Sequence, residues 1–201
     1  MTTARDLAIV ALDVSRRRPL EQGDLSLALA GAEVLDLIEA RVLILDGDSL
    51  VPGPETPTGD RLLDEAASLL VRRRPYESVE DWLWRRGRGL ASAYTADLER
   101  LGLAARPRGR RIPLRTGRTV PVESPARRRA EERRASGEPV FDALAAAAGI
   151  QERPDEAFAD LADETATAVL AAVGEAVMEL EAQRQRRAIE NAAFDNIWRG
   201  Q

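Results

Sequence analysis

Apolar residues recur every three or four positions along most of the chain, which is the spacing of helices that bury one face. The clearest stripe lies in a helix for which Asp24 is the expected N-cap. Its apolar positions are Leu25, Ala28, Leu29, Ala32 and Leu35. Further helices are predicted from Asp60 until Pro75, from about Ser78, and over 90–101, 140–148 and 154–191.

Two segments have a pattern that allows more than one structure, and a third has a pattern that requires a partner helix. Residues 1–15 fit a short helix or a strand-like entry, and 124–139 fit a very basic helix or a partly disordered linker. Within 154–191, apolar residues form a seam that requires a partner helix. The tail, 192–201, carries an aromatic cluster: Phe194, Ile197 and Trp198.

Two β-hairpins are predicted between the helices. In 41–51, Asp46-Gly47-Asp48 supplies the residues that a tight turn requires, and turn formation accounts for both aspartates. In 110–122 the strands flank Thr116-Gly117, and prolines in them favour edge strands. The whole pattern predicts one mainly α domain over 1–201 with small β-hairpins.

The composition excludes much of enzyme chemistry. The chain has no cysteine and no histidine, and all 29 of its basic residues are arginine. A disulfide, a thiolate nucleophile, a cysteine-ligated zinc and the usual proton shuttle are therefore absent. We expect a binding protein without catalytic residues, metal or cofactor.

The charge is unevenly distributed, although the net charge is only -5. Residues 85–134 hold 15 arginines against five acidic residues, whereas 141–201 hold five arginines against 12 acidic residues. The basic segment is expected to attract phospholipid, nucleic acid or an acidic partner. The alternative is that the basic and acidic segments face each other in the fold or in an oligomer.

No stretch approaches the roughly 20 apolar residues that span a bilayer, and acidic residues interrupt the N-terminal apolar stretch, which lacks a basic leader. We therefore expect a cytoplasmic protein that reaches a membrane only at its surface.

Three segments resemble one family when they are taken in order. They are 29–42 (LAGAEVLDLIEARV), 56–66 (TPTGDRLLDEA) and 97–103 (DLERLGL), the last followed by a hairpin. Over about 5–185 the chain resembles the Golgi phosphoprotein 3 family, including its bacterial members. The resemblance implies a compact helical domain with hydrophobic central helices, amphipathic outer helices and a hairpin for self-association, here 110–122. It also implies a peripheral membrane protein that binds phosphatidylinositol 4-phosphate and, in eukaryotes, the cytosolic tails of Golgi glycosyltransferases.

The resemblance also indicates candidate headgroup-binding residues. Arg88 matches an arginine of the family's pocket, Arg85 and Arg86 are substitutes beside it, and Arg17 and Arg18 lie in the matching loop.

Three other pocket positions are replaced in this chain. The family's tryptophan falls near Glu21, and two of its arginines fall on Ala30 and Ala91. Because Glu21 would repel a phosphomonoester, we expect binding to anionic lipid in general more than to this phosphoinositide.

The sequence allows two alternatives to a membrane adaptor. A helix over 90–101 followed by a hairpin over 110–122 could imitate a nucleic-acid-binding winged helix, but Asp97 and Glu99 disfavour it. An enzyme is the weakest hypothesis, since the glycines and arginines of 85–89 lack the lysine of a phosphate loop. We therefore expect a homo-oligomeric peripheral membrane adaptor at the cytosolic face, with nucleic acid as an unlikely partner.

Overall fold

The computed structural model describes residues 2–106, 119–152 and 163–199, with side chains described as far as 191. This part of the chain forms eight helices and two antiparallel strand pairs. The helices are α1 (Thr3–Ser15), α2 (Gln22–Glu39), α3 (Arg61–Ser68), α4 (Val79–Arg86), α5 (Leu90–Arg100), α6 (Pro125–Ala135), α7 (Pro139–Ala147) and α8 (Glu164–Arg199). The strands are β1 (Leu43–Asp46), β2 (Ser49–Pro52), β3 (Ala104–Ala105) and β4 (Val120–Pro121). The predicted mainly α class is confirmed.

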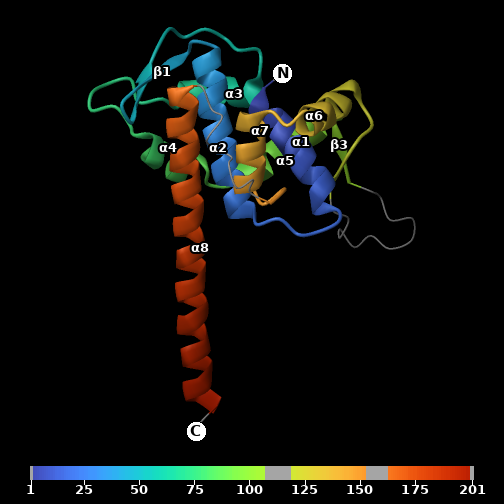
Figure 1. Cartoon of the computed structure of the whole chain (residues 1–201), viewed down its shortest axis with the longest axis vertical. Helices are drawn as coiled ribbons and strands as arrows, with labels where there is room; N and C mark the ends of the chain where they lie inside the picture. The colour runs from blue at the N-terminus through green and yellow to red at the C-terminus, as the bar shows by residue number, and fades with distance from the viewer. Residues whose placement is uncertain (1, 107–118, 153–162, 200–201) are drawn as a thin grey trace.

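Helix α2 is the centre of the fold, with α1, α4, α5, α7 and α8 packed around it (Figure 1). Its residues from Leu25 to Val34 are all buried. Neighbouring elements therefore cover the helix on all sides over this length, and not only on the single apolar face that the spacing of its apolar residues predicts. The Trp82 side chain of α4 lies against it and donates a hydrogen bond from Nε1 to the carbonyl oxygen of Ala30 at 3.3 Å. A helix rich in alanine and leucine suits this position, because its small side chains let several neighbours approach closely.

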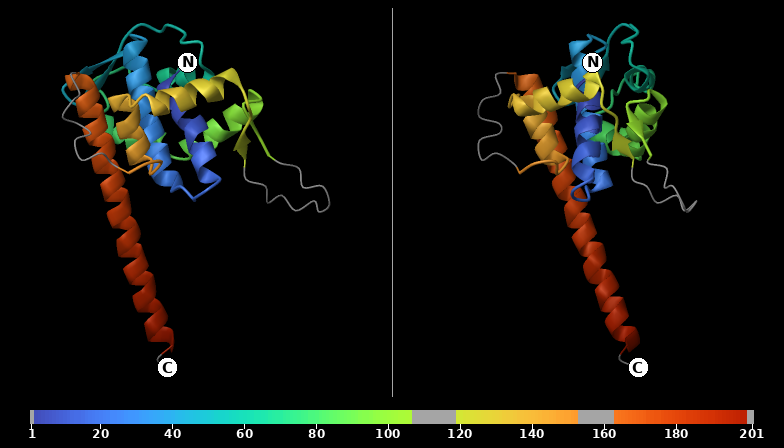
Figure 2. Two further views of the ribbon diagram at one scale, coloured as in Figure 1. Left: turned by 45° about the vertical axis from the view of Figure 1, so that its right-hand side comes forward. Right: turned by 90° about the vertical axis from the view of Figure 1, so that its right-hand side faces the viewer.

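Helix α8 finds its partner helix within the same chain. Its first half packs on α2, α4 and α7 and buries Val169 and Val173. Two glycines of α2 permit the close approach: a Cβ atom at Gly31 would lie 2.3 Å from Val173 Cγ2, and one at Gly23 would lie 2.6 Å from Leu180 Cδ2. The second half projects away from the domain as a single helix (Figures 1 and 2).

The first hairpin forms as predicted. Strand β1 pairs with β2 in the register that places Ile44 opposite Val51, and Gly47 in the turn has a φ of 62°. Leu43 and Leu50 are buried, whereas Ile44 points outward. Most of the second predicted hairpin, 110–122, lies outside the described residues. Within the described part, Val120–Pro121 (β4) pairs with Ala104–Ala105 (β3), which precedes the predicted hairpin.

Several predicted boundaries change. Residues 3–15 and 125–135 are helices, which settles the two alternatives left open for those segments. Helix α2 starts earlier than predicted, with Glu21 as its N-cap residue. The predicted cap, Asp24, instead forms an ion pair with Arg184 of α8 at 2.8 Å. The backbone of α8 continues as helix past 191, so the aromatic tail is an extension of α8, although its side chains lie outside the described part.

Part of the basic middle segment is neutralised by the N-terminal half of the fold. Arg127 pairs with Asp13 at 3.1 Å and Arg133 with Asp6 at 3.4 Å, so α6 is tied to α1 by charge. These acidic partners lie outside the acidic C-terminal segment. Among the described residues, no helix is both long and apolar enough to cross a membrane.

Candidate functional site

A pocket of about 250 Å³ lies where the start of α2, the turn between α4 and α5, and α8 meet. Its lining is largely apolar, with serine and glutamine side chains and one guanidinium group. The lining residues are Gln22, Gly23, Ser26, Leu27, Leu83, Trp84, Gly87, Arg88, Gly89, Ala91, Ser92 and Leu180.

The backbone of the α4–α5 turn is shaped by two glycines. A Cβ atom at Gly87 would lie 2.5 Å from the carbonyl oxygen of Leu83, so only glycine fits this close turn. Gly89 adopts a left-handed φ of 73° as the N-cap residue of α5 and offers no side chain to cap the helix. Ser26 of α2 supplies a cap, because its hydroxyl accepts a hydrogen bond from the Ala91 N–H at 3.1 Å. The turn therefore places Arg88 directly before the N-cap residue of α5, at the positive end of the helix dipole.

Arg88 is the cation that the pocket presents to solvent. Its side chain is exposed, and within the described residues it makes no hydrogen bond or ion pair. A guanidinium group in this state keeps all of its donors for a carboxylate or phosphate oxygen. This is the arginine that the sequence matched to the family's headgroup pocket.

Arg85 lies outside the pocket and is held by neighbouring groups. Its guanidinium group donates two hydrogen bonds of 2.6 Å to Glu77 and one of 3.2 Å to the carbonyl oxygen of Leu69. The hydrogen bonds that Arg85 donates to Glu77 raise the pKa of Arg85 above its usual value. The guanidinium carbon also lies 5.1 Å from the centre of the Trp82 ring. Arg85 therefore closes a loop, and its capacity to bind a further anion is reduced.

Arg86 points into the core, so we remove it from the candidate headgroup-binding residues. It donates hydrogen bonds of 2.8 and 2.9 Å to Glu33 and one of 2.8 Å to Glu65. Tyr94 completes this network by donating from its hydroxyl to Glu33 at 3.1 Å. Glu33 is fully buried, and this burial raises its pKa despite the hydrogen bonds from Arg86.

The structure keeps Arg17 and Arg18 away from the pocket lining. Both are exposed in the loop between α1 and α2. Arg18 donates a hydrogen bond of 2.6 Å to the carbonyl oxygen of Gly149, which fastens this loop to the end of α7. The side chain of Arg17 makes no hydrogen bond or ion pair with any described residue. It is a free cation on the loop that leads into the pocket-forming end of α2.

The replaced family positions take different places in the fold. Ala30 and Ala91 are buried, at 0% and 2% exposure, so neither position presents a side chain to a ligand at the surface. Glu21 is exposed at the start of α2, beside the pocket. A residue that the sequence did not single out, Arg184, lies 4.0 Å from the Glu21 carboxylate and 2.8 Å from Asp24. The sequence could have indicated that Arg184 lies near α2, because it follows Leu180 by one helical turn and Leu180 belongs to the seam that packs on α2.

The chemistry available at the pocket is therefore anion binding by one free guanidinium group. No group of three or more acidic side chains in the described ranges is arranged to hold a metal ion. The remaining polar lining consists of neutral hydroxyl and amide groups.

The sequence model of the Golgi phosphoprotein 3 (GPP34) family matches residues 4–197, nearly the whole chain. No curated protein sequence matches the chain. A match over this length, together with the helical fold described above, decides the family. The chain belongs to the Golgi phosphoprotein 3 (GPP34) family.

Proposed function

We propose that the protein is a non-catalytic peripheral membrane adaptor that binds anionic lipid headgroups through the pocket at Arg88. The observation that carries this proposal is the free guanidinium group of Arg88, held at a glycine turn beside the start of α5. Family membership supports it, because the resemblance implies headgroup binding at this position. The expected location is the cytosolic face of a membrane.

The charge of the pocket favours a singly charged headgroup. A phosphomonoester carries nearly two negative charges, and one free guanidinium group compensates only part of this. The two further arginine positions of the family are the buried Ala30 and Ala91, and Arg184 is already paired with Asp24. Glu21 adds a nearby negative charge. A phosphodiester lipid such as phosphatidylglycerol or phosphatidylserine therefore suits the site better than phosphatidylinositol 4-phosphate.

The apolar lining favours a lipid over a free anion. Leu27, Leu83 and Leu180 form the wall, and the half-buried Trp84 is part of the lining. Tryptophan and long basic side chains suit the boundary between lipid headgroups and acyl chains, where one part of the side chain contacts apolar groups and the other contacts water. The pocket thus combines one charged and one apolar contact.

Vesicle co-sedimentation tests the proposal. The intact protein should bind vesicles that contain phosphatidylglycerol, bind neutral phosphatidylcholine vesicles much less, and be released as salt rises. Arg88→Glu should weaken binding more than Arg134→Glu, a matched change at an exposed arginine of α6. Equal binding to both kinds of vesicle, or to neither, would refute the membrane hypothesis. Equal losses in the two variants would show diffuse attraction without a headgroup site.

Binding of membrane-protein tails and self-association through 110–122 are further expectations of this proposal. The nucleic-acid alternative gains no support from α5, the helix that would have to enter a groove. Asp97 on this helix is buried and accepts hydrogen bonds from Arg61 and Arg100 at 2.8 and 3.1 Å. We therefore retain the lipid-binding proposal alone.

A further inference from the structure

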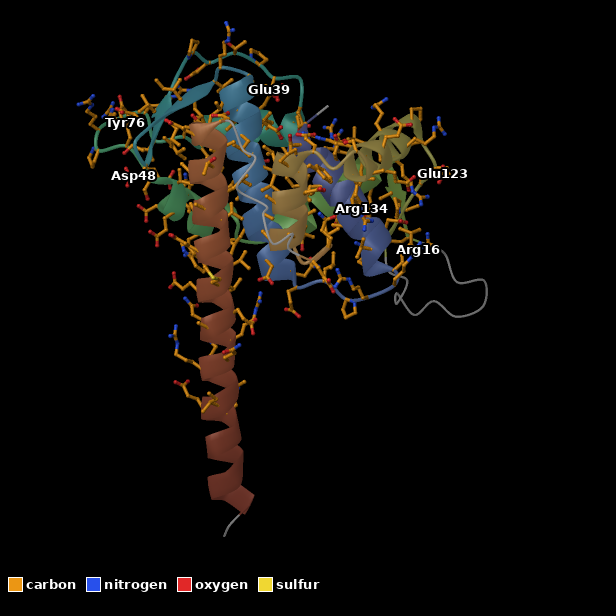
Figure 3. The ribbon with its side chains drawn as sticks, viewed as in Figure 1. Arg16, Glu39, Asp48, Tyr76, Glu123 and Arg134 are labelled. Atoms are coloured by element: carbon orange, nitrogen blue, oxygen red, sulfur yellow. The ribbon has the colours of Figure 1, made fainter. Side chains whose placement is uncertain are left out.

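A loop between α3 and α4, residues 69–77, forms a protruding corner of the domain beside the β1–β2 hairpin. Figure 3 shows Tyr76 of this loop next to Asp48 of the hairpin turn. Two backbone hydrogen bonds join the segments: Leu50 N–H donates to the Glu77 carbonyl at 2.8 Å, and Val79 N–H donates to the Asp48 carbonyl at 2.9 Å. We call the surface made by the loop and the outer side of the hairpin the arginine corner.

The loop is held firmly at both ends. Arg85 contacts the Leu69 carbonyl oxygen and the Glu77 carboxylate at the same time, which brings the two ends of the loop together. Leu70 is buried and anchors the chain from inside. The residues between these anchors are therefore presented on a fixed base, and the cost of ordering them on binding is small.

Exposed aliphatic side chains occur in both segments of this corner. Ile44 is 60% exposed, Leu69 43% and Val71 40%, and all three belong to the loop or the hairpin. The pairing of β1 and β2 fixes the direction of Ile44, because its neighbour Leu43 points into the core. Exposed aliphatic groups on a rigid surface are available for contact with an apolar partner.

Arginine side chains lie among these aliphatic groups. Arg72 pairs with Glu55 at 3.0 Å, and the guanidinium carbon of Arg74 lies 5.7 Å from the centre of the Tyr76 ring. Arg73 and Arg74 make no ion pair with a described carboxylate. Asp46 and Asp48 of the hairpin turn lie at one edge of the arginine corner. Their negative charges moderate the attraction of the corner for anions.

We propose that the arginine corner is a second membrane contact, in which Val71 and Ile44 enter the headgroup region of an anionic bilayer while Arg73 and Arg74 bind lipid phosphates. Aliphatic and basic side chains on one surface are the composition of interfacial membrane anchors. Nucleic acid would use the arginines but would leave the aliphatic groups without a role. This proposal rests on the proposed membrane function and adds a contact separate from the Arg88 pocket.

The absence of cysteine from the chain provides a direct test. A Val71→Cys variant carries a single thiol, which is labelled with the polarity-sensitive fluorophore NBD. Its emission should rise with vesicles of phosphatidylcholine and phosphatidylglycerol and stay unchanged with phosphatidylcholine alone. A Ser136→Cys variant, labelled in the same way on the exposed end of α6, should show no rise with either vesicle.

Paired substitutions separate this corner from general charge. Because each basic residue near an anionic surface strengthens binding about five-fold, Arg73→Ala with Arg74→Ala should weaken vesicle binding about 25-fold. The control replaces Arg128 and Arg134, two exposed arginines of α6, and should lose much less. In Figure 3, Tyr76 and Arg134 lie on opposite sides of α8, so the two pairs probe different faces.

The outcomes distinguish this proposal from the proposed function. If the protein binds anionic vesicles but the Val71 label does not respond, the arginine corner is not a membrane contact and the Arg88 site stands. If the unmodified protein binds no vesicles, both proposals are wrong. A label that responds to duplex DNA and not to vesicles would assign the corner to nucleic acid and overturn the proposal.

Discussion

Replacing Arg86 with methionine is expected to destabilise the fold severely, because the change leaves the Glu33 carboxylate buried without its cation. Glu33 is 0% exposed, and Arg86 provides two of its hydrogen bonds. Among the described residues, only the Tyr94 hydroxyl would remain as a side-chain donor to Glu33. Methionine fills a volume similar to that of arginine. The loss of stability therefore comes mainly from the broken ion pair and not from a cavity.

Breaking one side of a buried ion pair costs about 3–5 kcal/mol. For a chain of this length, each kcal/mol corresponds to a shift of about 2–4 °C in Tm, so the expected fall is roughly 6–20 °C. Replacing both partners, Glu33→Met with Arg86→Met, should recover most of this loss, because no uncompensated charge remains.

The neighbouring residue Arg85 supplies a matched control. It also binds one carboxylate with two hydrogen bonds, but its side chain is 41% exposed, so water can replace it. Arg85→Met should cost about 1 kcal/mol or less, as exposed ion pairs do. Urea unfolding followed by circular dichroism gives the free energy of unfolding for each variant.

The pH dependence of the Arg86→Met variant adds a second readout. Burial raises the pKa of Glu33, so the folded state takes up its proton more readily than the unfolded chain. The contribution of Glu33 to stability should therefore be fully present at low pH and be lost as pH rises through the raised pKa. A loss below 1 kcal/mol for Arg86→Met, or equal losses at Arg85 and Arg86, would refute the importance we assign to burial.

Two further predictions concern pH and assembly. Burial raises the pKa of Asp36 from 3.8 to about 6, against the hydrogen bonds from the Ala4 and Thr3 N–H groups. Its contribution to stability is thus fully present below about pH 4 and lost as pH rises through 6, and Asp36→Asn should flatten the measured unfolding free energy over that range. Replacing 110–122 with a short Gly/Ser linker should convert a homo-oligomer into a monomer by light scattering. A monomer before and after the change would rule out self-association.

Local signals in the sequence were sufficient to predict several helix ends, although α3 ends at Ser68 and not at Pro75 as predicted. Ser78 caps α4 by accepting a hydrogen bond from the Asp81 N–H, and Asp60 caps α3 in the same manner. Gly102 has a φ of 69° just after α5, a left-handed value that suits glycine at the residue following a helix. These features depend on neighbours within four positions, so the sequence contains all the information that they require.

The site was harder to predict because it depends on residues far apart in the chain. Arg86 belongs to a run that looks uniformly exposed, yet it follows Trp82 by four positions and therefore shares its buried face. Its partner Glu33 lies 53 positions away, and no local pattern reveals the pair. The free state of Arg88 likewise follows from which carboxylates the fold brings near the α4–α5 turn, and this is known only from the packing.

Because α8 contacts α2 closely at Gly31 and Val173, a small rotation of α8 near this contact moves its C-terminal end by a larger distance. From Val173 to Arg199 the helix rises about 39 Å, at 1.5 Å for each residue. A tilt of about 10° around that contact would move the far end by about 7 Å. A substitution at Gly31 that displaces α8 slightly from α2 is therefore magnified at the end of the chain, so the position of the last helical turn depends on the size of a residue in the core.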